Sequence, residues 1–163
     1  MSIPIENGVL FFRQLLRSAP GGSPGKIGKY CVNQKIVFKR AGGPDQLALE
    51  EAPDCAPGSG EVRIRVLATG VAFGDILLRR GLAGGRFPVT PGYDLVGVVD
   101  ALGVGATAFK LQDRVAALPG TGALQQSICL LESELVAVPG AVSSEKAAAL
   151  ILNYVTAYQL LVR

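Results

Sequence analysis

The alternation of apolar and polar residues predicts a chain built mostly of short strands. The pattern is clearest over residues 61–71, where Val62, Ile64 and Val66 alternate with polar or less buried positions, so that one face of the strand is buried. Shorter runs predict further strands, several of them separated by Gly or Pro turns. These runs are 36–38, 47–51, 95–102, 114–118, 125–131 and 135–138. Such spacing favours a small barrel over a parallel sheet.

Two segments have helical patterns. Residues 74–80 predict a short helix that Gly81 ends. Residues 147–161 are apolar apart from three isolated polar side chains, and either Ser143 or Ser144 can cap a helix there. A helix this apolar must be covered on most of its sides. Since it lies at the end of the chain, we expect that the part that covers it is missing.

The N-terminal residues 1–30 differ from the rest of the chain. Their apolar patch is too short for a signal peptide, and residues 19–28 are a linker rich in Pro, Gly and Ser. We expect a flexible extension here. A mitochondrial leader is the alternative, because Arg13 and Arg17 are present and acidic residues are scarce.

Composition excludes several classes of chemistry. A chain of 163 residues can build one domain but not two full enzyme domains. Because it contains no histidine, it has no His-based zinc site, no Ser-His-Asp or Cys-His triad and no imidazole acid or base. With 21 Gly and 10 Pro, its composition suits a turn-rich, mostly β protein.

Cysteine and charge give broader limits. Cys31, Cys55 and Cys129 form no Cys-x-x-Cys pair, and their odd number argues against a disulfide framework. A reducing, cytoplasmic setting is therefore the default. Residues 1–40 hold seven basic side chains and one acid, whereas residues 41–163 hold nine and twelve. The body is thus mildly acidic, so nucleic acid is not an implied partner, and no apolar run is long enough to span a membrane.

Residues 103–108 fit the dinucleotide fingerprint Gly-x-Gly-x-x-(Gly/Ala) after a predicted strand. The context does not fit, because Pro119 and Gly120 follow too soon for a crossover helix and no acid stands about twenty residues further on. We therefore interpret these residues as a plain turn between antiparallel strands.

Six stretches form an ordered set of motifs along the chain. They are Val37–Pro44, Gly60–Val66, Gly70–Asp75, Pro91–Val99, Asp113–Val115 and Asn153–Tyr158. Their order resembles the N-terminal, GroES-like catalytic domain of the medium-chain dehydrogenase/reductase superfamily. Within it the chain is similar to the zinc-free branch, the quinone-oxidoreductase or zeta-crystallin-like enzymes.

This resemblance implies a mostly β fold with short helices: a partly open GroES-like barrel over residues 31–163. Zinc relatives have a cysteine and a histidine where this chain has Phe73 and Tyr93, and neither side chain can ligate zinc. In relatives a Rossmann domain that holds NADPH or NADH follows. The chain ends before such a unit, so the resemblance implies a fragment, a truncated gene product or one part of a split enzyme.

The resemblance also implies roles for four residues, each with a structural alternative. Tyr93 could donate its phenol O–H to the acceptor oxygen, or be a tyrosine at the rim of the core that bonds to backbone. Asp75 matches an acid of the family's cleft, but could equally be a charge at the start of a helix. Asn153 and Thr156 match positions near the nicotinamide, yet could simply bond to neighbouring backbone.

The chain also departs from the quinone-oxidoreductase pattern. It has Ala72, Leu77 and Ala83 where relatives carry an asparagine and tyrosines, which leaves the substrate open. Phe73 is expected in the core rather than as a stacking platform. A run of basic residues, Arg79, Arg80 and Arg86, could attract a cofactor phosphate but more commonly forms a solvated face.

Two functions follow as expectations. The first is the catalytic half of a zinc-independent NAD(P)H-dependent oxidoreductase that reduces a quinone, an enone or a related carbonyl compound and is inactive alone. The second is a non-catalytic GroES-like interaction module. The expected partners are the small-molecule substrate and either a second copy of the chain or a complementary Rossmann-domain chain.

Overall fold

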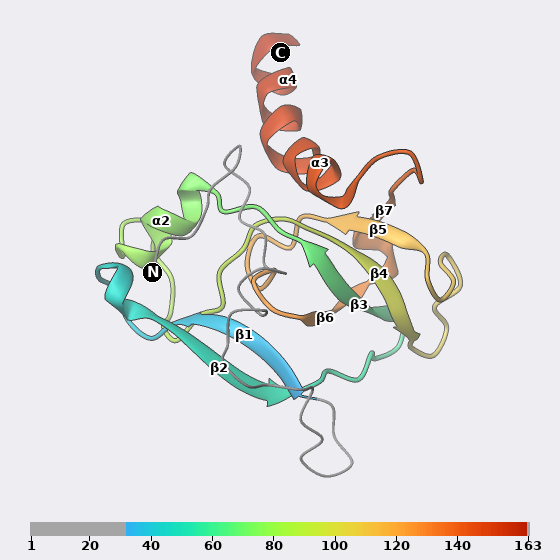
Figure 1. Ribbon diagram of the computed structural model, residues 1–163, viewed down its shortest axis with the longest axis horizontal. Coiled ribbons are helices and arrows are strands. Elements are labelled where there is room, and N and C mark those ends of the chain that lie inside the picture. The colour runs from blue at the N-terminus through green and yellow to red at the C-terminus, as the bar shows by residue number, and fades with distance from the viewer. Residues whose placement is uncertain (1–31, 163) are drawn as a thin grey trace.

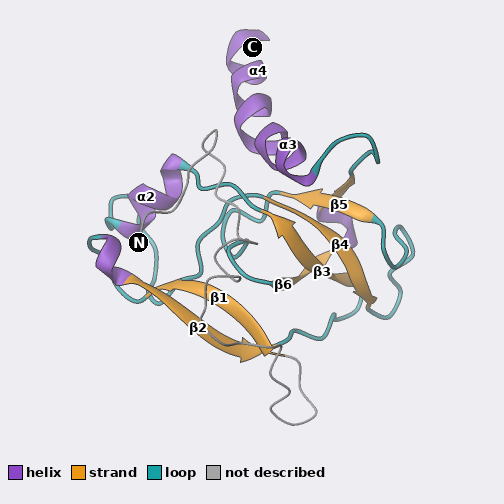
Figure 2. Ribbon diagram, viewed as in Figure 1, coloured by secondary structure: helices purple, strands orange, loops and turns teal. Residues whose placement is uncertain are grey.

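Two antiparallel sheets form the framework of residues 32–162, the part of the chain that this computed structural model describes (Figure 1). β1 (Val32–Phe38) pairs with β2 (Leu47–Pro53) in a two-stranded sheet. The second sheet has the strand order β6-β3-β4-β5-β7. Its strands are β3 (Glu61–Ala68), β4 (Leu95–Leu102), β5 (Arg114–Ala117), β6 (Ser127–Leu131) and β7 (Leu135–Ala137). The predicted mostly β fold with short helices is confirmed, and its sheets are open rather than closed (Figure 2).

β4 lies between two apolar layers, which explains its nearly continuous apolar sequence. On one face Leu95 and Val99 belong to the main core cluster together with strand β3. On the other face Val96 belongs to a second cluster with Ala147 and Ala148 of helix α3 (Ser144–Ala149). A strand buried on both faces has no wet side for polar residues. Each fully buried valine or leucine contributes about 1.5–3 kcal/mol to folding.

The Gly103-Val104-Gly105 sequence forms a turn that follows β4, as predicted, and not a phosphate loop. A Cβ atom on Gly103 would lie 1.8 Å from the carbonyl oxygen of Gly58. The glycine is therefore required because two chain segments touch there. Two 3₁₀ turns, η1 (Pro44–Gln46) and η2 (Glu132–Glu134), complete the short connections.

The helices follow the sequence prediction with shifted ends. α2 (Phe73–Arg79) stops before Gly81, whose φ is +75°. α3 begins at Ser144 because the Ser143 side chain accepts a hydrogen bond from the backbone N–H of Lys146, so Ser143 is the cap. The predicted terminal helix is present as one continuous run: α3, a π-helical segment η3 (Leu150–Tyr154) and α4 (Val155–Val162).

The terminal helix projects away from the sheets (Figure 1). Its first turn is covered by the sheet, since Ala147 and Ala148 are buried. Further along, Leu160 and Leu161 are 80% and 86% exposed. The described part of the chain therefore covers only the start of this helix. No helix in residues 32–162 has the length and apolar character needed to cross a membrane.

The two sheets are joined through Asn33, a buried polar residue of β1. Its side-chain nitrogen donates to the backbone oxygen of Ser127 at 3.0 Å, and its oxygen accepts from the backbone nitrogens of Gln126 and Ser127 at 3.1 Å each. The backbone N–H of Ile36 also donates to the carbonyl of Leu124 at 2.9 Å. One amide side chain thus adds its hydrogen bonds to a short antiparallel bridge between Lys35 and Gln125, just before β6.

The structure corrects the expectation about cysteines. Cys55 and Cys129 form a disulfide bond with their Cα atoms 6.2 Å apart. The third cysteine, Cys31, and the predicted extension over residues 1–30 lie outside the described residues.

Candidate active site

A buried carboxylate, Asp75, stands in the first turn of α2 and connects three segments. One of its oxygens accepts the backbone N–H of Gly92 at 2.8 Å, and the other accepts the N–H of Ala72 at 2.9 Å. Asp75 is 2% exposed. Its bond to Ala72 satisfies a free N–H at the helix start. Asp75 therefore stands where the alternative interpretation, a charge at the start of a helix, places it. Its bond to Gly92 fixes the loop that precedes β4.

A second buried carboxylate, Asp94, lies close to Asp75. It accepts the backbone N–H of Gly70 at 2.7 Å, and its own backbone oxygen accepts the Thr69 hydroxyl at 2.6 Å. Desolvation by burial raises the pKa of Asp75, and backbone hydrogen bonds lower it less. Desolvation also raises the pKa of Asp94, and the nearby charge of Asp75 adds to that rise. The folded protein therefore disfavours the state in which Asp75 and Asp94 are both ionised.

Tyr93 lies directly over Gly74. A Cβ atom on Gly74 would be 2.8 Å from three atoms of the tyrosine ring, including the hydroxyl oxygen. Tyr93 also follows Gly92, which Asp75 holds. The structure therefore brings together the two predicted catalytic residues, Tyr93 and Asp75, through the glycines beside them.

Phe73 is placed differently from its prediction. It starts α2 next to Gly74 and is 70% exposed, so the expectation that it belongs to the core is wrong. The buried residues of the helix are Asp75 and Leu78, and Phe73 is not among them. An exposed aromatic ring thus stands one residue from the glycine under Tyr93.

The predicted cofactor residues lie elsewhere. Asn153 is in η3 and Thr156 is in α4, and both are exposed on the projecting helix. Figure 1 shows this helix apart from α2, the helix that carries Asp75. Their donor set fits a nicotinamide carboxamide, because an amide and a hydroxyl supply both the donors and the acceptors that a carboxamide needs.

The three basic residues Arg79, Arg80 and Arg86 have different environments. Arg79 donates to the carbonyl oxygen of Gly42 at 2.6 Å and so holds the η1 turn to α2. Arg80 and Arg86 are exposed. Of the three arginines, only Arg80 and Arg86 form the solvated face that a run of basic residues predicts.

No three side chains of His, Cys, Asp or Glu are grouped as metal ligands within residues 32–162. The chemistry present is a phenol donor, an exposed aromatic ring and two buried carboxylates. This set can hold a planar acceptor and donate a hydrogen bond to its oxygen.

Sequence reasoning did not single out Asp94. The available signal is an acid directly before a strand that is apolar on both faces, because such an acid is drawn into the core with its neighbours. A second signal is Gly70, where a Cβ would lie 2.8 Å from an Asp94 carboxylate oxygen.

Comparison with known proteins defines the class. The family model of the alcohol dehydrogenase GroES-like domain matches residues 58–143. The synaptic vesicle membrane protein VAT-1 homolog of Rattus norvegicus is 39% identical over 130 residues, which are 77% of this chain and 32% of that protein. The solved quinone oxidoreductase of Pseudomonas syringae pv. tomato DC3000 is 37% identical with a TM-score of 0.75, covering 80% of this chain and 41% of that one. For the Escherichia coli quinone oxidoreductase complexed with NADPH the values are 30%, 0.73, 80% and 40%.

These matches and the open antiparallel sheets define a GroES-like domain of the alcohol dehydrogenase type. The chain belongs to the medium-chain dehydrogenase/reductase superfamily, in its quinone-oxidoreductase-like branch. It spans about a third of the length of the rat relative.

Proposed function

We propose that this chain is the catalytic-domain half of a zinc-independent NAD(P)H-dependent oxidoreductase that reduces a quinone, an enone or a related carbonyl compound. The observation that carries the proposal is the phenol of Tyr93 lying over Gly74, whose neighbour in the chain, Phe73, is exposed. A conjugated carbonyl gains negative charge on its oxygen when it accepts a hydride, and a phenol O–H placed there stabilises that charge. The Phe73 ring offers a flat apolar face to a planar acceptor.

Asp75 acts in this proposal as a positioning residue. Both of its oxygens are occupied by backbone N–H groups, one of which belongs to Gly92, the neighbour of Tyr93. The carboxylate therefore fixes the loop that carries the phenol rather than touching the substrate. Such fixed geometry matters because a small displacement of a reacting group costs a large part of the rate.

NADPH or NADH supplies the hydride when bound, and Asn153 and Thr156 would hold its carboxamide. The similar Escherichia coli quinone oxidoreductase was solved in complex with NADPH, which supports this cofactor class. Because both residues stand on the projecting helix, apart from α2 (Figure 1), we propose that a nucleotide-binding half is needed to bring cofactor and phenol together, and that the chain alone is inactive.

The test is a chimera in which residues 32–162 replace the matching part of the Pseudomonas syringae quinone oxidoreductase. We expect it to oxidise NADPH in the presence of a quinone. Tyr93→Phe should lower kcat roughly 100-fold, the usual effect of removing one donor to a developing oxyanion. Ser133→Ala, which removes an exposed hydroxyl from η2, is the control. Equal rates for the two variants would contradict the role of Tyr93.

The chain alone gives a second test. Mixed with NADPH and a quinone, purified 1–163 should show no loss of NADPH absorbance. Measurable turnover would overturn the proposal that a further half is required.

A second candidate function is a non-catalytic interaction module, and the exposed Leu160 and Leu161 of α4 favour it. In that case the terminal helix would bind a second copy or a complementary chain. A folded chimera that binds NADPH but reduces no quinone, enone or carbonyl compound would support this module over the enzyme.

A further inference from the structure

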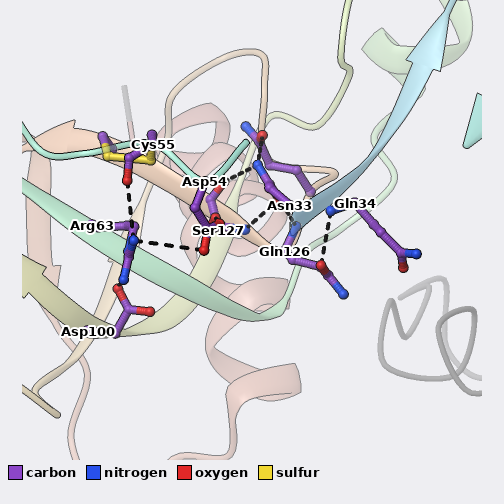
Figure 3. Close-up of polar contacts among 10 residues, drawn as sticks. Asn33, Gln34, Asp54, Cys55, Arg63, Asp100, Gln126 and Ser127 are labelled. Atoms are coloured by element: carbon purple, nitrogen blue, oxygen red, sulfur yellow. Dashed lines mark hydrogen bonds and ion pairs between the residues drawn. A yellow bond between two sulfur atoms is a disulfide. The ribbon is translucent and has the colours of Figure 1, made fainter. Parts of the chain in front are cut away.

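We infer that Cys55 and Cys129 form a reversible redox site, a dithiol that interconverts with its disulfide while the domain stays folded. Cys55 lies in the irregular segment between β2 and β3, and Cys129 lies on β6, the edge strand of the larger sheet (Figure 3). The bond joins residues 74 positions apart. Both cysteines are partly exposed, so a small thiol or disulfide can reach them.

Polar contacts hold Cys55 beside β6 independently of the sulfur bond. The Asp54 carboxylate accepts the hydroxyl of Ser127, two residues before Cys129. Arg63 of β3 lies 3.8 Å from the other Asp54 oxygen and donates to the backbone oxygen of Cys55 at 3.4 Å. Figure 3 shows these groups gathered around the disulfide. The two thiols therefore remain neighbours when the disulfide is reduced.

Backbone bonds fix the far end of the same segment. The N–H of Gly60 donates to Val104 at 2.9 Å, and the N–H of Glu132 donates to Gly60 at 3.0 Å. The near end continues from β2. Because both ends are held without the disulfide, reduction changes the middle of the segment and leaves the sheets in place. Preorganised thiols also re-form their bond readily, since closure is then an intramolecular step.

The proposed oxidant is a low-molecular-weight disulfide, glutathione disulfide. One cysteine thiolate attacks a glutathione sulfur, and the first glutathione leaves as thiolate. The second cysteine thiolate then attacks the protein sulfur of this mixed disulfide and releases the second glutathione. Two electrons pass from the cysteine pair to glutathione, and the two protons lost by the cysteines protonate the two glutathione thiolates. Excess glutathione reverses the sequence.

The experiment is a redox titration of folded 1–163 carrying Cys31→Ser, which removes the third thiol. The protein is equilibrated in glutathione buffers of increasing oxidised share, alkylated, and measured by mass spectrometry. We expect one two-electron transition that is the same in both directions, with an unchanged far-ultraviolet circular dichroism spectrum. Adding either Cys55→Ser or Cys129→Ser should abolish it.

A thermal melt gives an independent measurement. The oxidised form should melt roughly 10 °C above the reduced form, because the bond restricts a long loop of the unfolded chain. A pair that stays reduced in the most oxidising buffer would overturn the inference. So would a pair that can be reduced only after denaturation, since it would then be a permanent crosslink. Neither result depends on the proposed oxidoreductase activity.

Discussion

At the scale of single residues, the backbone N–H groups around each buried carboxylate determine how much stability an asparagine substitution costs. Asp75 uses both oxygens, each for a different N–H group. The Asp94 carboxylate accepts the N–H of Gly70 at one of its oxygens. An asparagine has one acceptor oxygen and one NH₂ group. The two positions should therefore respond differently to the same substitution.

We expect Asp75→Asn to lower the free energy of unfolding by about 1–3 kcal/mol, because one backbone N–H then faces an NH₂ group in a buried place. Asp94→Asn should cost clearly less, since its remaining oxygen can still accept from Gly70. Urea unfolding at pH 7 measures both values. Equal losses would contradict the hydrogen-bond assignment.

The pH dependence of stability provides a prediction for Asp94. Desolvation raises the pKa of folded Asp94 above its ordinary value of 3.8, so its contribution to stability is full below that value. It is lost as pH rises through the raised pKa, because the unfolded chain ionises more easily. The stability of Asp94→Asn relative to the natural protein should therefore increase between pH 4 and 7, by at most about 1.4 kcal/mol per pH unit.

Gly74 and Gly97 offer a matched pair of glycine substitutions. A Cβ on Gly74 meets the movable ring of Tyr93, whereas a Cβ on Gly97 meets the backbone oxygen of Arg65 at 2.4 Å. Gly74→Ala should change stability by less than about 1 kcal/mol, since alanine also favours the helix, but should shift the near-ultraviolet circular dichroism of tyrosine. Gly97→Ala should cost more than about 2 kcal/mol. An unchanged tyrosine spectrum in Gly74→Ala would contradict the contact.

At the scale of elements, the start of α3 can be tested directly. Ser143→Ala removes the oxygen that accepts the N–H of Lys146 and should cost about 1 kcal/mol. Ser144→Ala should cost less, because it leaves the cap in place and because Arg114, the donor to Ser144, keeps its bond to Pro139. Thermal unfolding of the two variants compares them, and the reverse order would mean that Ser144 is the cap.

The elements show what sequence could predict. β4 was predicted with its observed bounds because an apolar run between turn signals is a local pattern. The first half of β1 was missed, since Asn33, Gln34 and Lys35 are polar. Asn33 is buried because its amide bonds to backbone groups 93 and 94 positions away and to the Gln125 side chain. No local pattern reports such a distant partner.

For the candidate site, too, some residues could be found from the sequence and others could not be placed correctly. The family motifs brought Asp75 and Tyr93 to attention, and the structure joins them. Phe73 was misplaced because apolar character predicts burial on average, whereas its exposure depends on which face of α2 the rest of the fold covers. The Cys55–Cys129 bond was missed because the pairing depends on how β6 lies beside the segment after β2.

At the scale of the whole molecule, the projecting helix makes a prediction about association. Contiguous exposed apolar residues are unusual on a monomer, and from Leu150 onwards this helix exposes most of its large side chains. We expect purified 1–163 to associate in a concentration-dependent way in sizing chromatography. Replacing Leu160 and Leu161 with Glu should reduce association, whereas Val104→Glu, on an exposed turn, should not. A clean monomer at all concentrations would count against this expectation.

The contacts of Asn33 also determine when, during synthesis on the ribosome, the two sheets can come together. β1 and β2 emerge early and are close enough in sequence to pair at once. Yet the partners that attach them to the larger sheet, Gln125 to Ser127, are translated some ninety residues later. During that interval water supplies the hydrogen bonds of Asn33, on the side of the hairpin that will become buried. The domain can therefore close only after most of its chain has been made.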